Sequence, residues 1–474
     1  MNKIKAYTKG LLFASLAVAG LTLSSCKDQP DKYEVADGKP TVNYIRCLST
    51  EVHNNNDAAD MHYTNGELVM EASPQSTLAL VGENLRSVYE LYFNDRKAVL
   101  NTSYITDNAL IVDVPKDVPI MVTDKIYMIT QSKDTVTCDF HVIIPAPVIT
   151  AMSCEYAKPG DRVTITGSYM VNDAGVPLEV SFRNAQDQDI PATINSISDD
   201  FTSIEVTVPD DAAEGPITVT SIYGTTLSSF YYQDTRGMLF DFDNGRTQQG
   251  WHARTITSSE KSLSGNYLVL GEGATMSEDG GWDDGNNSFE YWCGDWNTPQ
   301  SYPDPQGVRL FDVVDFSKAE NMSLKFEMCI PSSNAWAAGA MQIIFAPTSY
   351  VTLSGNSPDV YGDAVYGANN IFFRCPGQSD WDNSDYFAKK NPLPRALYRP
   401  WTTTGSFDTN GEWITVTIPI ASSFVYSFDG SGLPFSLQEE DFASLTIFII
   451  GGGVNGTECN PYIMIDNIRA VPNK

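Results

Sequence analysis

Residues 413–420 read Trp413-Ile414-Thr415-Val416-Thr417-Ile418-Pro419-Ile420, and the alternation of apolar and polar side chains in this stretch decides the class of fold. Successive side chains of a β-strand point to opposite faces of its sheet, so the four aliphatic residues share one face and Trp413, Thr415 and Thr417 share the other. The stretch therefore predicts a strand with one face in a hydrophobic core and the other partly exposed.

Similar strand-like stretches surround this one throughout residues 238–474. They lie at residues 239–243, 323–330, 340–345, 370–374, 445–450 and 462–468. The region is long enough for one large β-sandwich. We therefore expect residues 238–474 to form a single all-β domain.

Short apolar or alternating runs also fill residues 40–235, where turn residues separate them roughly every eight to twelve positions. The clearest runs are residues 77–81, 109–114, 126–130, 163–166, 204–208 and 217–221. No stretch of this region carries a convincing helical period of about 3.6 residues. The pattern is typical of all-β sandwiches.

The region 40–235 also contains the same plan twice. In each copy a strand ends in glycine, at Gly82 and at Gly167. The later matches are residues 91–93 with 180–182, residues 112–115 with 206–209, and Phe140 with Phe230. Two tandem immunoglobulin-like sandwiches, residues 40–144 and 145–235, explain this repeat. Pro145-Ala146-Pro147 predicts a stiff, extended joint between them.

Residues 1–25 have the features of a secretory signal, with lysines followed by an apolar segment too short to span a bilayer comfortably. The segment ends in Leu23-Ser24-Ser25-Cys26, which resembles a bacterial lipobox. The resemblance implies removal of residues 1–25, lipidation of Cys26 and a membrane anchor made of acyl chains. An ordinary signal peptide with a chance cysteine is the alternative. Polar residues 26–39 are expected to form a tether.

Composition argues against several partners and chemistries. The net charge of −29 repels polyphosphates, so we do not expect nucleic acid as a partner. Seven cysteines follow Cys26 without a Cys-x-x-Cys motif, which favours small buried side chains, with one or two disulfides as the alternative. The four histidines show no metal-ligand spacing, and common catalytic signatures are absent. We therefore expect no catalytic residues, no cofactor and no metal site.

One structural calcium ion remains an alternative to this expectation. Asp241, Asp243 and Asp466 lie near the two ends of the C-terminal domain, and these ends pair in many jelly rolls. Their carboxylates could share Ca²⁺. No EF-hand spacing supports the ion, and ordinary turn and edge carboxylates are the competing interpretation.

Aromatic chemistry is concentrated in the C-terminal half, since all eight tryptophans follow residue 250. Residues 281–296 hold three of them among Gly, Asp and Asn, which is a poor core and a plausible binding surface. Indole and phenol rings stack on the C–H faces of sugars, while polar side chains bind the hydroxyl edges. The composition of this loop therefore predicts a sugar-binding platform.

The residues proposed for this platform fall into two groups, and plugging a loop onto the sandwich is the alternative role for each. The first candidates are Trp292, Trp296 and Trp336, the last flanked by small residues that would leave room for a ligand. The second candidates are Trp282, Tyr291, Trp381 and Trp401, whereas Trp251 and Trp413 are expected to pack structurally. The proposed polar partners are Asp283, Asp284, Asp295, Asn334 and Gln342.

Two stretches carry a family resemblance. Residues 147–149 with 158–167, which include Lys158-Pro159-Gly160-Asp161, resemble the opening of an IPT/TIG immunoglobulin-like domain, and residues 40–42 with 78–85 match more loosely. Residues 240–243, 412–419 and 463–469 together resemble carbohydrate-binding jelly rolls. With the lipobox, the chain resembles the B-type surface glycan-binding lipoproteins of Bacteroidetes, which carry a C-terminal xyloglucan-binding domain.

This resemblance implies a non-catalytic protein on the cell surface, anchored in the outer membrane. It implies binding of a neutral β-glucan, xyloglucan or mixed-linkage glucan, beside a SusC/SusD-like transporter and a surface glycosidase. Two other functions stay open from the residues alone. A glycoside hydrolase or lyase could draw a carboxylate pair from Asp279, Asp283, Asp284, Glu290 and Asp295. A protein-binding adhesin or fimbrial component could use the tandem sandwiches as a stalk.

Overall fold

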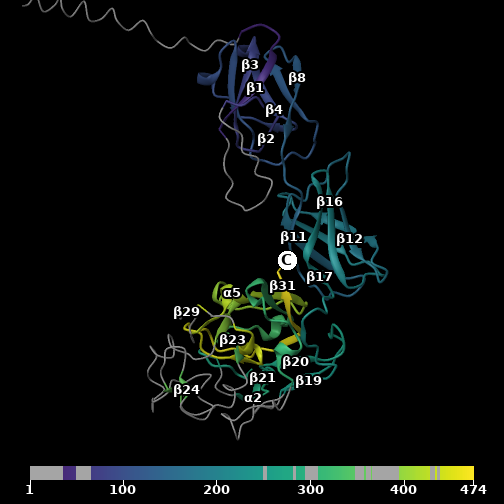
Figure 1. The fold of residues 1–474 in the computed structure, drawn as a ribbon, viewed down its shortest axis with the longest axis vertical. Helices are drawn as coiled ribbons and strands as arrows, with labels where there is room; N and C mark the ends of the chain where they lie inside the picture. The colour runs from purple at the N-terminus through teal and green to yellow at the C-terminus, as the bar shows by residue number, and fades with distance from the viewer. Residues whose placement is uncertain are drawn as a thin grey trace, which may run out of the picture. The chain divides into compact units, whose positions relative to one another are not determined.

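The computed structural model of the 474-residue chain describes residues 36–49, 66–248, 254–280, 284–293, 308–346, 357–358, 364–365, 394–426, 433–434 and 438–473. Contacts divide the chain into two compact units, residues 1–145 with 172–176, and residues 146–171 with 177–474 (Figure 1). Within the described ranges, no helix has both the length and the apolar character needed to cross a membrane. The predicted signal, lipidation site and most of the tether lie outside these ranges.

The first unit holds an all-β sandwich. Its strands are β1 (Thr41–Ser49), β2 (Glu71–Ala72), β3 (Thr77–Glu83), β4 (Val88–Phe93), β5 (Arg96–Lys97), β6 (Ala109–Asp113), β7 (Lys125–Thr130), β8 (Thr135–Asp139) and β9 (His141–Val142). They form the sheets β1-β3-β6 and β5-β4-β7-β8, and a short parallel pair β2-β9. Alternate residues of both larger sheets are buried, among them Leu78, Leu80, Leu91 and Phe93.

The second immunoglobulin-like domain belongs to the second unit and repeats this plan. Its strands are β10 (Val148–Met152), β11 (Arg162–Ser168), β12 (Glu179–Arg183), β13 (Asp189–Pro191), β14 (Thr193–Ile197), β15 (Ser203–Thr207), β16 (Gly215–Ser221) and β17 (Gly224–Tyr232). They form the sheets β10-β11-β15-β14 and β13-β12-β16-β17. One hydrophobic core, which includes Ile165, Phe182 and Val206, draws residues from both sheets.

The two immunoglobulin-like domains share one backbone device. A Cβ atom added at Gly82 would lie 1.8 Å from the carbonyl oxygen of Thr41, and one added at Gly167 would lie 1.7 Å from that of Val148. In both domains the register of the first strand shifts directly after the residue paired with the glycine. The glycines are therefore needed for close approach of a bulged neighbouring strand, which is more specific than the turn that sequence alone suggests.

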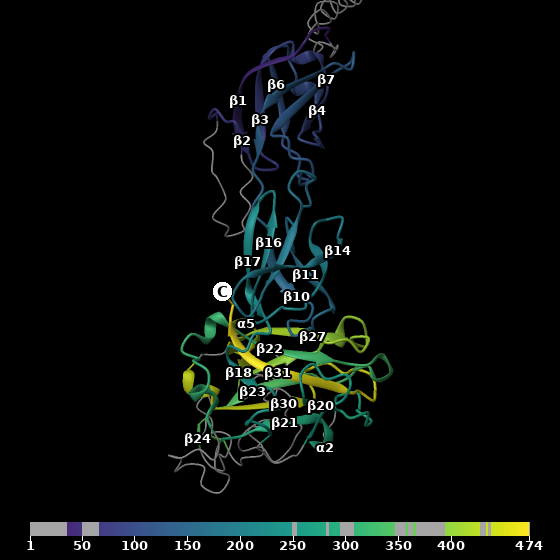
Figure 2. The same ribbon diagram turned by 90° about the vertical axis from the view of Figure 1, so that its right-hand side faces the viewer.

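The C-terminal domain is a larger sandwich of two six-stranded sheets, seen as layers in Figure 2. The first sheet has the order β19 (Thr255–Thr257), β20 (Tyr267–Leu270), β31 (Ile463–Pro472), β22 (Met322–Cys329) and β27 (Ile414–Pro419), with β18 (Met238–Phe240) paired to β31. The second has the order β21 (Ser288–Tyr291), β30 (Ser444–Ile449), β23 (Met341–Ala346), β26 (Arg395–Tyr398), β28 (Val425–Tyr426) and β29 (Leu433–Pro434). Strands β24 (Ser357–Pro358) and β25 (Ala364–Val365) form a separate pair.

Helices in this domain are short. They are α2 (Asp284–Asn287), α5 (Ile420–Ser423), and the 3-10 turns η3 (Leu310–Asp312), η4 (Ala319–Asn321), η5 (Ser332–Asn334), η7 (Pro400–Thr402) and η8 (Glu439–Phe442), while η1 (Leu85–Ser87) and η2 (Thr102–Tyr104) lie in the first unit. The all-β class predicted from the sequence is thus confirmed. The strand predicted at residues 413–420 is observed as β27, and the last aliphatic residue of that stretch, Ile420, begins α5.

The core of the C-terminal domain lies between its two sheets. In β22 the inward residues Leu324, Phe326 and Met328 belong to this core, and the ring of Phe316 stacks on that of Phe442 at 4.2 Å. All eight residues of β22 are buried, so its outward face is covered as well.

The observed units differ from the predicted domain boundaries in three respects. The first division falls at Pro145, and residues 172–176 group with the first unit. No such division falls between residues 235 and 238, although the strands on the two sides of this point belong to different sheets. The predicted strand at residues 370–374 lies outside the described residues.

Candidate functional site

Trp336 lies in the core, so the prediction that it contacts a ligand is wrong. Its side chain is fully buried, and its indole N–H donates to the carbonyl oxygen of Ala338. The backbone N–H of Trp336 donates to the carbonyl oxygen of Phe407 at 2.9 Å, and the backbone N–H of Phe407 donates to the carbonyl oxygen of Trp336 at 2.8 Å. The ring therefore anchors a loop to the sandwich.

The small residues around Trp336 explain this outcome. A Cβ atom at Gly339, where φ is 66°, would lie 2.8 Å from the Cα of Gly280. A Cβ atom at Gly456 would lie 2.0 Å from the carbonyl oxygen of Ala337. The space that small residues leave is therefore filled by neighbouring backbone and not by a ligand.

Trp401 and Tyr291 are also core residues, which corrects two further predictions. The indole N–H of Trp401 donates to the carbonyl oxygen of Gly339 at 2.8 Å. The hydroxyl of Tyr291 donates to the carbonyl oxygen of Val308 at 2.7 Å, and burial raises the pKa of this phenol. Both rings are at most 3% exposed, which leaves no face for a sugar.

Trp292 remains a candidate. It directly follows β21, is partly buried, and its indole N–H donates to the hydroxyl of Thr446 at 3.2 Å. Trp413 packs as predicted, since its indole N–H donates to the carbonyl of Lys261 at 2.6 Å and its ring meets that of Tyr267 edge-on. Trp251, Trp282, Trp296 and Trp381 lie outside the described residues, so their roles stay predictions.

The outward face of the second sheet carries a set of polar side chains beside Trp292. We call this set the polar face; it consists of Glu290 on β21, Thr446 on β30, Gln342 on β23 and Arg395 on β26. Glu290 pairs with Thr446, Thr446 with Ile344, and Ile344 with Arg395, so three of the four lie in one row across the sheet. Strand alternation places them opposite the core, because their sequence neighbours Phe289, Ile343, Ala396 and Leu445 belong to it.

The polar face is held in place by hydrogen bonds. The side-chain amide of Gln342 donates to the carbonyl oxygen of Ile450 at 2.8 Å, and its oxygen accepts from the guanidinium of Arg395. Burial lowers the pKa of Arg395. The set combines amide, guanidinium, hydroxyl and carboxylate groups, which are kinds of group that bind sugar hydroxyls, but all four side chains are at most 4% exposed. Trp292, which donates to Thr446, is partly buried.

Only part of this face was predicted from the sequence. Trp292 and Gln342 were proposed for the sugar-binding platform, and Glu290 was considered only as a catalytic carboxylate. Arg395 and Thr446 were missed. Arg395 directly precedes the core residue Ala396 in a strand-like run, and this alternation could have placed Arg395 on the outward face of a strand.

The other proposed polar partners give little support to a site. Asn334 is partly exposed, and its side-chain amide donates to the carbonyl oxygen of Asn460 at 2.9 Å. Asp283, Asp295 and the side chain of Asp284 lie outside the described residues. Of the remaining carboxylates weighed for hydrolysis, Asp279 is exposed and accepts from the Ser277 hydroxyl at 2.8 Å, whereas Glu290 is buried.

The three aspartates weighed for calcium act as local hydrogen-bond acceptors. Asp241 accepts from the Asn244 N–H at 2.9 Å, and Asp243 accepts from the Asn266 N–H at 2.7 Å. Asp466 is fully buried, and burial raises its pKa to about 8. Across the described ranges, no group of three or more His, Cys, Asp or Glu side chains is placed to hold a metal ion.

Cysteines in the described part of the chain are free thiols. Cys47, Cys154, Cys293 and Cys329 are buried, and Cys138 and Cys459 are partly buried. The interpretation as small buried side chains holds for the first four, and Cys375 lies outside the described residues.

Comparisons with known proteins show that most of this chain is similar to known proteins. Residues 232–472 match the model of the surface glycan-binding protein B xyloglucan-binding domain. The crystal structure of the surface glycan-binding protein PbSGBP-B from Prevotella bryantii is similar, with 42% sequence identity and a TM-score of 0.75 over 93% of this chain and 100% of that chain.

Two more distant relatives have related descriptions. SGBP-B from a complex xyloglucan utilization locus in Bacteroides uniformis aligns with 12% identity and a TM-score of 0.39 over 92% of this chain and 100% of that chain. An IPT/TIG domain-containing protein of Bacteroides ovatus is 26% identical over 236 residues, which are 47% of this chain but only 44% of that protein. The family model and the Prevotella structure show that the chain belongs to the surface glycan-binding protein B family.

Proposed function

We propose that the C-terminal domain binds a neutral β-glucan, with xyloglucan as the first ligand and mixed-linkage glucan as the alternative. One observation carries the proposal: residues 232–472 match the family model of a xyloglucan-binding domain. The relatives are binding proteins and not enzymes, which favours capture of the glycan over its cleavage. Family membership also favours glycan binding over the adhesin hypothesis.

Trp292, which adjoins the polar face through Thr446, supports this ligand class. A neutral glucan offers no charge, so recognition relies on ring stacking and on hydrogen bonds to hydroxyl groups. Trp292 is partly buried and donates its indole N–H to Thr446, whereas Gln342 and Arg395 are buried on β23 and β26, further across the sheet. The charge of −29 over the whole chain disfavours strongly acidic polysaccharides.

The family and the leader-like N-terminal sequence support a place for the protein at the cell surface. Surface glycan-binding proteins act at the cell surface, and the lipobox-like sequence before Cys26 supports a lipid anchor in the outer membrane. The protein would hold the glycan for a surface glycosidase and for an outer-membrane SusC/SusD-like transporter. Loss of surface labelling in a Cys26→Ala strain would test the anchor.

Affinity electrophoresis of the full chain, with Cys26→Ala to prevent lipidation, tests the ligand. We expect retardation in gels that contain xyloglucan or mixed-linkage β-glucan, none in polygalacturonate, and no release of reducing ends. Trp292→Ala should weaken xyloglucan binding about ten-fold, which corresponds to about 1.4 kcal/mol. The buried-ring control Trp401→Phe should keep its affinity.

The possible outcomes separate the site from the function. Unchanged retardation of the Trp292→Ala variant would move the site away from the polar face. If no neutral β-glucan retards the parent chain, the proposed function is wrong. Time-dependent release of reducing ends would establish the hydrolase alternative.

A further inference from the structure

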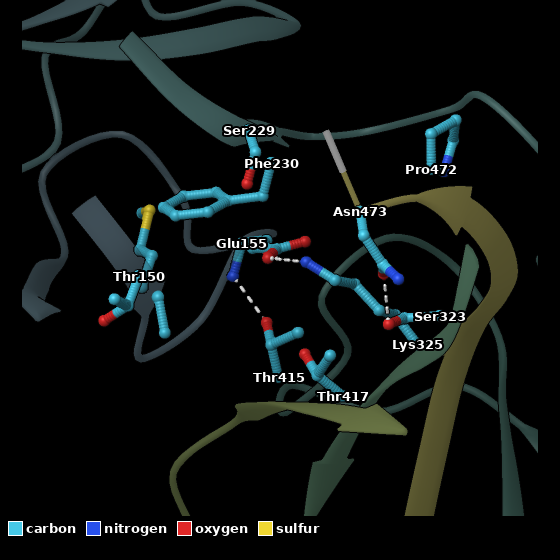
Figure 3. A pocket seen from close by; sticks show the side chains of 12 residues that line it. Thr150, Glu155, Ser229, Phe230, Ser323, Lys325, Thr415, Thr417, Pro472 and Asn473 are labelled. Atoms are coloured by element: carbon cyan, nitrogen blue, oxygen red, sulfur yellow. Dashed lines mark hydrogen bonds and ion pairs between the residues drawn. The ribbon is translucent and has the colours of Figure 1, made fainter. Parts of the chain in front are cut away.

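Four buried charged side chains join the second immunoglobulin-like domain to the C-terminal domain. Glu155, in the loop between β10 and β11, accepts from the ammonium of Lys325 at 2.5 Å and from the guanidinium of Arg469 at 2.7 Å (Figure 3 shows the lysine contact). Arg469 also donates twice to Glu327, at 2.8 and 3.0 Å. Glu155 is 2% exposed, and Glu327 and Arg469 are fully buried.

Hydroxyl and aromatic groups complete this cluster. The hydroxyl of Thr415 donates to Glu327 at 3.0 Å and accepts from the backbone N–H of Glu155 at 2.7 Å. The guanidinium of Arg469 lies 4.9 Å from the ring centre of Tyr156, and the ammonium of Lys325 lies 5.3 Å from that of Phe230. Glu155, Lys325 and Arg469 therefore each have a charged partner from the other domain, while Glu327 is held by Arg469 and Thr415 of its own domain.

Apolar and backbone contacts extend the same contact area. The backbone N–H of Thr415 donates to the carbonyl oxygen of Ser153 at 2.9 Å, and Lys158 donates to the carbonyl oxygen of Ser262 at 2.8 Å. Leu263 and Trp413 of the C-terminal domain pack against the core of the immunoglobulin-like domain.

A cavity of about 190 Å³, lined partly by serine and threonine hydroxyls, borders Lys325 and Glu155 (Figure 3).

Charge balance requires both domains. The cluster has two carboxylates and two cations, but the C-terminal domain alone keeps both cations and only Glu327, while the immunoglobulin-like domain alone keeps only Glu155. Burial would lower the pKa of Arg469, but the charges of Glu327 and Glu155 outweigh this effect and raise it. A buried charge that loses its partner is strongly destabilising.

We infer that the second immunoglobulin-like domain and the C-terminal domain form one cooperative folding unit that is locked by the charge cluster Glu155, Lys325, Glu327 and Arg469. The immunoglobulin-like domain is then an integral part of the sandwich that follows it, and not a spacer. The smallest autonomous fragment begins near Ala146 and not at Met238. This inference goes beyond the proposed function and does not depend on any glycan.

Calorimetry and hydrogen exchange on the full chain test the inference. In the parent protein, β10–β17 and β18–β31 should lose protection in one shared transition. Glu155→Gln keeps the shape of the side chain and removes its charge. It should lower the midpoint of this transition, and it should speed exchange at least ten-fold in residues 150–156, β22 and β31. The matched control is Glu205→Gln. Glu205 lies on β15 and forms an exposed ion pair with Arg162, so its substitution should change neither the transition midpoint nor the exchange rates.

A second variant keeps the inference testable if Glu155→Gln does not fold. Lys325→Met removes one cation and leaves the pair of Glu155 with Arg469. The double variant Glu155→Gln/Lys325→Met should lose less than the sum of the two single losses, because the first change already breaks their bond. Separate transitions for the two domains in the parent protein, or additive losses in the double variant, would overturn the inference.

Discussion

The two immunoglobulin-like domains have the same strand plan but treat charge in different ways. In the described part of the first domain, pairs such as Lys97 with Glu90 and Lys125 with Asp139 are partly or largely exposed. In the second domain, Glu155 is buried and is neutralised by cations of the C-terminal sandwich. The difference shows how one loop acid can convert an independent module into part of its neighbour.

The largest expected effect tests the buried side of this comparison. Arg469→Met leaves Glu155 and Glu327 buried with only Lys325 to balance them, so we expect a loss of about 3–5 kcal/mol in unfolding free energy. Tryptophan fluorescence during urea unfolding reports the C-terminal domain directly, since all eight tryptophans follow residue 250. A loss below about 1 kcal/mol, the range of exposed ion pairs, would remove the distinction between the two domains.

A buried acid sharpens the comparison. Among the described residues, the Oδ2 atom of Asp466 has no hydrogen-bond partner, and burial raises the pKa of this carboxyl to about 8. The pKa of an aspartate in the unfolded chain is about 3.9. Between about pH 4 and pH 8, the folded state therefore keeps a proton on Asp466 that the unfolded state has already lost. The contribution of Asp466 is therefore present at low pH and is lost as the pH rises through this window.

Asp466→Asn should remove this pH dependence. We expect the difference in unfolding free energy between parent and variant to change by about 4 kcal/mol from pH 5 to pH 8.5, in favour of the variant at high pH. Urea unfolding at several pH values measures it. A constant difference across the range would show that Asp466 is ionised in the folded protein.

The shared glycine device predicts similar effects in both immunoglobulin-like domains. Gly82→Ala and Gly167→Ala each place a methyl group within 2 Å of a backbone oxygen, so a strand must move. We expect a loss of about 1–3 kcal/mol in each case. Domain-resolved hydrogen exchange measures both, and a large effect in one domain only would break the structural equivalence of the repeats.

The smallest effect is expected on the exposed side of the comparison. Lys97→Met removes a cation that bonds the Glu90 carboxylate at 2.6 Å across strands β4 and β5. Solvent screens this pair, so the unfolding midpoint of the first domain should not change measurably. A shift as large as that of Arg469→Met would show that exposure does not decide the strength of these pairs.

The strands were predictable from the sequence because alternation follows directly from strand geometry. Residues 413–420 and the repeated glycine strands gave the all-β class and the tandem plan. The burial of Trp336 was not predictable in the same way. Its alanine and glycine neighbours fit a ligand pocket and a tightly packed backbone equally well, and only the contacts of Gly280 and Gly456 distinguish the two.

The burial of isolated charged residues was also not predictable from the sequence. Glu155 and Arg395 look like surface residues in a linear sequence, where charged side chains are usually exposed. The partners of Glu155 lie 170 and 314 positions away, so no local pattern reveals them. Within the candidate site, Trp292 and Gln342 were predictable from the sequence. Arg395 and Thr446 could be assigned to it only from the register of the second sheet.

Isothermal titration of the full chain with an extended xyloglucan oligosaccharide is the sharpest test of glucan binding by this protein. We predict a saturable heat of binding with one site per chain and no hydrolysis of the titrant. A flat titration with xyloglucan and with mixed-linkage glucan, under conditions where the protein is folded, would contradict it.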